Sequence, residues 1–154
     1  MMETRMQNVK QILKWPLIFA AAVVVLRVIV ERAGASDAVA NILSVVALHF
    51  LIGPVYFAIR VGMSAESRPY FTLFKLIALY VVLTRIMILP TYWFARIYGW
   101  PQGRFGGLSG GSPFTGFFVI PFATAAFWII ASVIFGSVVG SFIIAIMRRF
   151  STRR

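Results

Sequence analysis

Long apolar stretches separated by short polar segments fill most of this 154-residue chain. The segment 38–59 carries no formal charge, and neither does the segment 105–147. Two further stretches, about 12–30 and 70–94, are apolar apart from two basic residues in each. Because a helix needs about 20 mostly apolar residues to cross about 30 Å of hydrocarbon, the pattern predicts four transmembrane helices.

The predicted fold is therefore an all-α, polytopic membrane protein with a single integral membrane domain over residues 1–154. The expected helices cover about 12–31, 38–60, 70–94 and 121–147, and a long glycine-rich loop covers 95–120. Charged residues make up 12% of the chain and hydrophobic residues 60%. A soluble domain carries about 25% charged residues, and a disordered chain is poor in hydrophobic ones. The composition therefore excludes both classes.

Glycine, serine and proline mark the ends of the expected helices. Gly34 can end the first helix, and Ser36 or Asp37 can cap the second. Pro69 suits the first turn of the third helix, because a proline at that position gives up no helix hydrogen bond. Pro121 is the natural start of the fourth, which leaves residues 114–120 at the membrane interface or re-entering its edge.

The basic residues flank the apolar stretches unevenly, and this bias predicts the orientation. With the N-terminus inside, ten lie on the inner side: Arg5, Lys10, Lys14, Arg60, Arg68, Lys75, Arg148, Arg149, Arg153 and Arg154. Only Arg32, Arg96 and Arg104 lie outside. We therefore expect both termini in the cytoplasm, an uncleaved N-terminal signal anchor, and a bacterial inner membrane location. The net charge of +11 then indicates contact with anionic lipid head groups rather than with nucleic acid.

Two arginines inside the expected spans are the first candidates for function, since intramembrane charges mark ligand or ion sites. Arg27 has Glu31 four residues later, which predicts an ion pair on one helix face. Arg85 has no acid within four residues, and both arginines are expected at a similar depth in the outer half of the bilayer. Arg85 should turn inward, either to Glu31, a carbonyl or a lipid phosphate, or to a bound anion, carboxylate or quinone carbonyl.

The single histidine, His49, falls near the middle of the second expected span. A neutral imidazole there can ligate haem iron or pigment magnesium, or it can be a hydrogen-bonded packing residue. Pro54 follows and removes a helix hydrogen bond, so a kink beside His49 is expected.

Small residues recur at a spacing of four in the last span: Ser132, Gly136 and Gly140. This spacing lets another helix approach closely. The partner helix can belong to this chain or to another one.

No catalytic set and no metal site are indicated by the sequence. The chain has no Cys and only four acidic residues, and no Lys-Ser or Lys-Thr follows the glycines of the loop to form a phosphate-binding motif. The expected function is therefore non-enzymatic. The leading hypothesis is a structural or accessory subunit, in a homo-oligomer or with a protein partner. The alternatives are a small channel or carrier for an anion, and a cofactor- or quinone-binding subunit of an electron-transfer complex.

Overall fold

The computed structural model describes residues 2–64, 66–100 and 112–151, and the regular secondary structure there is entirely helical. Four segments are long and apolar enough to cross a membrane: Val9–Arg32, Val45–Gly62, Pro69–Ile97 and Thr115–Phe150. These findings confirm the all-α fold with four candidate membrane spans.

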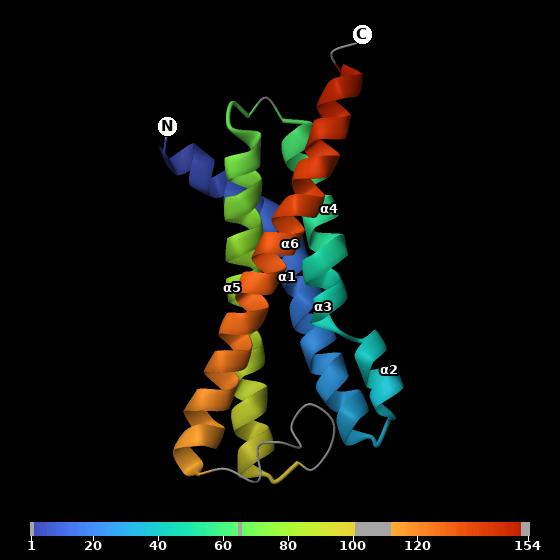
Figure 1. Cartoon of the computed structure of the whole chain (residues 1–154), viewed down its shortest axis with the longest axis vertical. Coiled ribbons are helices and arrows are strands. Elements are labelled where there is room, and N and C mark those ends of the chain that lie inside the picture. Colours follow the sequence, from blue (N-terminus) through green and yellow to red (C-terminus); the bar gives the residue numbers. More distant parts are fainter. Residues whose placement is uncertain (1, 65, 101–111, 152–154) are drawn as a thin grey trace.

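The long helices run side by side along one axis (Figure 1). They are α1 (Met2–Arg32), α4 (Gly53–Gly62), α5 (Pro69–Ile97) and α6 (Ile120–Ser151). Helix α6 packs against α4 and α5, and α1 packs mainly against α5. The start of α1 and the finish of α6 lie at the same end of the bundle, here called the termini end, and α1 and α5 both finish at the opposite end.

Glycines with positive φ close the two helices that stop at the opposite end. Gly34 has a φ of 83°, and the Ala35 amide donates to the Val30 carbonyl at 3.2 Å. Gly99 has a φ of 59°, and the Trp100 amide donates to the Ala95 carbonyl at 2.9 Å. This left-handed cap satisfies carbonyls that a helix end leaves open, and glycine adopts it without steric penalty. The predicted end of the first helix at Gly34 is confirmed, and Pro69 begins α5 as predicted.

The second expected helix is not continuous. A short helix, α2 (Asp37–Ile42), precedes a break at Leu43 and Ser44, and the spanning part follows as α3 (Val45–Ala47), η1 (Leu48–Ile52) and α4. The Ser44 hydroxyl accepts a hydrogen bond from the Val46 amide at 3.2 Å, whereas Ser36 makes no such cap. A serine hydroxyl competes with the helix for backbone amides, so the spanning helix starts at Ser44 rather than near Ala38.

Two π-helical turns precede prolines. In η1 the Gly53 amide donates to the Leu48 carbonyl just before Pro54, and in η3 (Thr115–Val119) the Ile120 amide donates to the Thr115 carbonyl just before Pro121. A proline inside a helix clashes with the carbonyl four residues earlier and cannot donate to it. One extra residue in the turn gives that carbonyl room.

Pro121 is therefore not the start of the last helix, which corrects the expectation from the sequence. The turn η3 runs directly into α6, so residues 115–120 are helical and extend the last span. The Trp93 indole donates to the Phe117 carbonyl at 2.9 Å, and this is the carbonyl that Pro121 leaves without its helix partner. The glycines at 103, 106, 107, 110 and 111 and Arg104, expected in the outer loop, lie outside the described residues.

Candidate functional site

Arg85 lies in the interior of the bundle on α5. Only 7% of its surface is exposed, so the expectation that it turns inward is confirmed. It precedes Ile97, the last residue of α5, by twelve positions, which places it about 18 Å from that end of the helix. Its charge is therefore held deep inside the span.

The Arg85 guanidinium lies next to the imidazole of His49. The separation between Arg85 Nη2 and His49 Nδ1 is 3.4 Å, and the His49 side chain is fully buried. The π-helical turn η1 carries His49 on the face that meets α5. Because a guanidinium can only donate, Nδ1 must accept, and in a neutral imidazole the proton then sits on Nε2.

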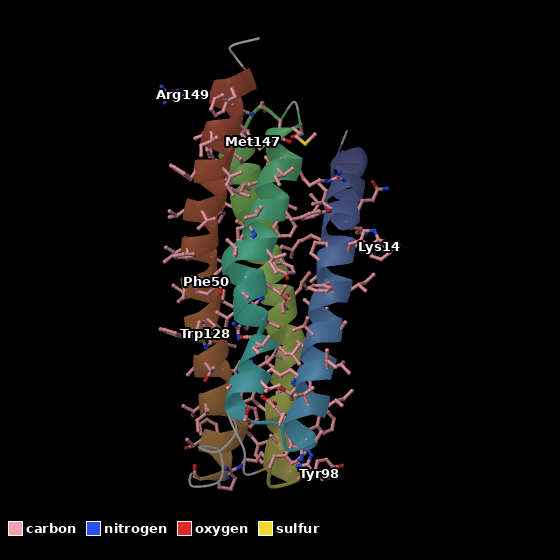
Figure 2. All side chains as sticks on the ribbon, turned by 90° about the vertical axis from the view of Figure 1, so that its right-hand side faces the viewer. Lys14, Phe50, Tyr98, Trp128, Met147 and Arg149 are labelled. Atoms are coloured by element: carbon pink, nitrogen blue, oxygen red, sulfur yellow. The ribbon has the colours of Figure 1, made fainter. Side chains whose placement is uncertain are left out.

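Aromatic rings also lie beside these two side chains. The Arg85 Cζ atom lies 5.5 Å from the centre of the Trp128 ring, within the range of a cation–π interaction. The Tyr80 ring meets the His49 ring edge-on at 5.5 Å. We use the name Arg85 cluster for Arg85, His49, Tyr80, Trp128 and Ser132. Ser132 is included because it lies on α6 between Trp128, which is next to Arg85, and Gly136, which is next to the His49 backbone. Figure 2 places Trp128 near mid-height of the bundle, beside Phe50.

Helix α6 reaches the Arg85 cluster through a ridge of residues spaced by four: Trp128, Ser132, Gly136 and Gly140. Side chains at this spacing share one helix face. A Cβ atom added at Gly136 would lie 2.9 Å from Pro54 Cγ and 3.2 Å from the His49 carbonyl oxygen. A Cβ at Gly140 would lie 2.8 Å from Leu73 Cδ2. The predicted close helix contact is confirmed, and its partners are α4, η1 and α5 of the same chain.

His49 Nε2 and Ser132 Oγ have no hydrogen-bond partner within the described part of the chain, and both side chains are fully buried. Nε2 carries a proton by the argument above, and a serine hydroxyl can also donate. The Arg85 cluster therefore combines a positive charge with two unused donors, an arrangement that suits an anion or another hydrogen-bond acceptor.

Arg27 takes part in a different interaction. Its Nε atom donates to Glu31 Oε1 at 2.8 Å, which confirms the expected pair at a spacing of four. Arg27 precedes Arg32, the last residue of α1, by five positions and is thus about 7 Å from that helix end. Arg27 therefore lies nearer to the end of its own helix than Arg85 does. The ion pair of Arg27 is formed within α1, whereas Arg85 lies next to His49 of η1 and Trp128 of α6.

The geometry around His49 disfavours the haem or pigment ligation considered for it. Coordination through Nε2 would need that nitrogen unprotonated, so the proton would move to Nδ1. Nδ1 would then point an N–H at the donors of Arg85 at 3.4 Å. The described residues contain no group of three or more acidic or histidine side chains placed to hold a metal ion.

Trp128 is the member of the Arg85 cluster that sequence reasoning missed. A signal was present, because Trp128 precedes Ser132 by four residues and so continues the small-residue ridge. Tyr80 precedes Arg85 on the same helix, and the structure places its ring against His49.

Comparisons of this chain with protein-family models, with curated proteins and with solved structures find no match.

Proposed function

We propose that this chain is a multi-pass membrane protein that binds an anion, or the anionic group of a small molecule, at the Arg85 cluster. One observation carries the proposal. A buried guanidinium lies beside a neutral His49, while His49 Nε2 and Ser132 Oγ remain without partners among the described residues. An anion would satisfy both donors and offset the charge together.

The energetics of burial favour such a ligand. A buried donor left unsatisfied costs about 1–3 kcal/mol, and an arginine at the centre of a membrane helix costs about 2.5–3.5 kcal/mol on insertion scales. Arg85, His49 and Ser132 come from three segments, α5, η1 and α6. Elsewhere in this bundle the helices pack through apolar side chains and glycine. Packing alone therefore does not explain why Arg85, His49 and Ser132 are buried together.

We further propose that the chain acts as a non-catalytic subunit of a membrane assembly. The support is the exposed apolar face of α1, where Ile18, Val25 and Ile29 remain uncovered by the other helices. The ridge of Ser132, Gly136 and Gly140 does not add to this support, because it is used inside the chain.

We propose that both termini face the cytoplasm of a bacterial inner membrane. The two ends lie at the same end of the bundle (Figure 1), as an even number of spans requires. The ten-to-three bias of flanking basic residues selects the side.

An alkaline phosphatase reporter fused after Arg104 should be active in the periplasm, and one fused at Arg154 should be inactive. The reverse pattern would contradict the orientation.

Iodide is a suitable probe of the Arg85 cluster, because it is an anion and also quenches tryptophan fluorescence on contact. Replacement of Trp15, Trp93 and Trp100 by Phe leaves Trp128 as the only tryptophan of the original four. In lipid nanodiscs, iodide should quench Trp128 along a saturable curve, and the neutral quencher acrylamide should give a shallow, linear one. Linear quenching by iodide would contradict anion binding.

A quinone carbonyl is the alternative acceptor that the geometry admits, and the same protein tests it. A short-chain benzoquinone should quench Trp128 no more than it quenches free indole in the same nanodiscs. Saturable quenching by the quinone, with none by iodide, would replace the anion proposal with the quinone-binding one.

A further inference from the structure

We propose that a groove between α1 and the segment formed by η1 and α4 binds one acyl chain of an anionic phospholipid near mid-height of the bundle, with the head group toward the termini end. The groove shares the Tyr80 ring with the Arg85 cluster, but this proposal does not depend on the anion proposal. The groove has a volume of about 220 Å³. Its walls include Trp15 of α1, Leu48 and Ile52 of η1, Gly53 and Tyr56 of α4, and Tyr80 of α5.

The lining suits a hydrocarbon chain. Apart from the Tyr and Trp polar tips, every lining side chain is apolar, and Trp15 and Ile52 are exposed by 68% and 51%. The groove therefore opens to the lipid side of a segment that is long and apolar enough to span a membrane. Helix α1 touches the rest of the bundle mainly through α5, which leaves the space beside α4 unfilled by protein.

Gly53 gives the groove its depth. A Cβ atom there would lie 2.8 Å from the Leu48 carbonyl oxygen and 2.9 Å from Tyr80 Cε1. Without that atom the Tyr80 ring packs directly on the backbone and forms the floor of the groove. The π-helical turn η1 precedes Gly53 and sets the position of Leu48 and Ile52 on the wall.

Charge at the termini end selects the lipid. Lys14 adjoins Trp15, with its Nζ atom 5.9 Å from that ring. Arg60 follows the lining residue Tyr56 by four positions on α4, hence on the same face, and both cations are exposed. Figure 2 shows Lys14 on α1 between the levels of Met147 and Phe50. Long basic side chains reach the head-group layer from such positions, so a lipid in the groove has two cations near its phosphate.

Trp15 reports on the occupant directly, because it is a wall of the groove. In a protein whose other three tryptophans are replaced by Phe, lipids with dibrominated acyl chains quench Trp15 when they touch it. Brominated phosphatidylglycerol should quench more than brominated phosphatidylcholine at equal fractions of the bilayer. The preference should be on the order of five-fold for each cation. Equal quenching by the two lipids would overturn the proposal and leave only ordinary boundary lipid.

Two matched pairs of variants locate the effect. Lys14→Gln combined with Arg60→Gln should abolish the preference, whereas Lys75→Gln should retain it, because Lys75 is on α5 with its Nζ atom 4.4 Å from the Phe71 ring. Ile52→Phe should fill the groove and reduce quenching, whereas Leu51→Phe, beside it but not in the wall, should not. A preference that survives the double variant would contradict the site. Arg85→Gln should leave the preference unchanged, which separates this result from the anion assay.

Discussion

Arg85→Leu should leave the bundle folded and weaken anion binding at the Arg85 cluster by about 10- to 150-fold, the range of a hydrogen bond to a charged group of about 1.5–3 kcal/mol. Folding should survive because replacing a buried charge by an apolar side chain is often neutral or stabilising. Leucine also fills part of the space beside Trp128. Iodide quenching of Trp128 measures the affinity, and a thermal melt in the same nanodiscs measures the stability.

Arg27→Leu is the matched control for this experiment. Arg27 is also a partly buried arginine of a spanning helix, but its described hydrogen bond is to Glu31 on the same helix. Its loss should leave iodide quenching of Trp128 within about two-fold of the original, below the range of a charged hydrogen bond. If Arg27→Leu weakened iodide quenching as much as Arg85→Leu, the loss would come from the lower net positive charge of the protein and not from an anion site at Arg85.

Gly136→Leu should have the largest effect on stability of any single change in α6. Its Cβ atom alone would come within 2.9 Å of Pro54 Cγ and 3.2 Å of the His49 carbonyl oxygen. Proline rings and backbone carbonyls cannot move aside as a side-chain end can. The helices must therefore separate, at a cost of about 3 kcal/mol or more, the upper part of the range for overpacked cores.

Gly140→Leu should be milder, since the nearest atoms are the end of the Leu73 side chain at 2.8 Å, which can change rotamer. We expect a loss of about 1–2 kcal/mol. Val138→Leu, on the lipid-facing side of α6 with 65% exposure, is the control and should be neutral. Chemical denaturation in mixed micelles ranks the three variants. Equal stability of Gly136→Leu and Val138→Leu would contradict the packing at the ridge.

Local sequence signals predicted the parts of the fold that depend on neighbouring residues. Gly34 ends α1, Pro69 begins α5, and Arg27 pairs with Glu31 because each feature is complete within a few residues of the chain. The close approach of the ridge was also predictable from its spacing. Its partner helices were not, because a spacing says nothing about what lies opposite.

The Arg85 cluster could be predicted only in part, because its contacts join distant segments. Arg85 and His49 are 36 positions apart, and the sequence singled out each of them without linking the two. Their pairing depends on η1, whose extra residue rotates the turn before Pro54. Prolines within apolar stretches predicted a kink and a helix start, but whether a π-helical turn accommodates them depends on tertiary partners such as the Trp93 indole.

The most direct test of the anion site is to locate an anion in the bundle. Crystals grown or soaked in sodium bromide, measured at the bromine absorption edge, give an anomalous difference map that identifies bromide without ambiguity. The account predicts a peak within hydrogen-bond distance of His49 Nε2 or Ser132 Oγ, next to the Arg85 guanidinium, and its disappearance in Arg85→Leu crystals. Peaks confined to the exposed basic residues at the helix ends, such as Arg32 and Arg149, would contradict the account.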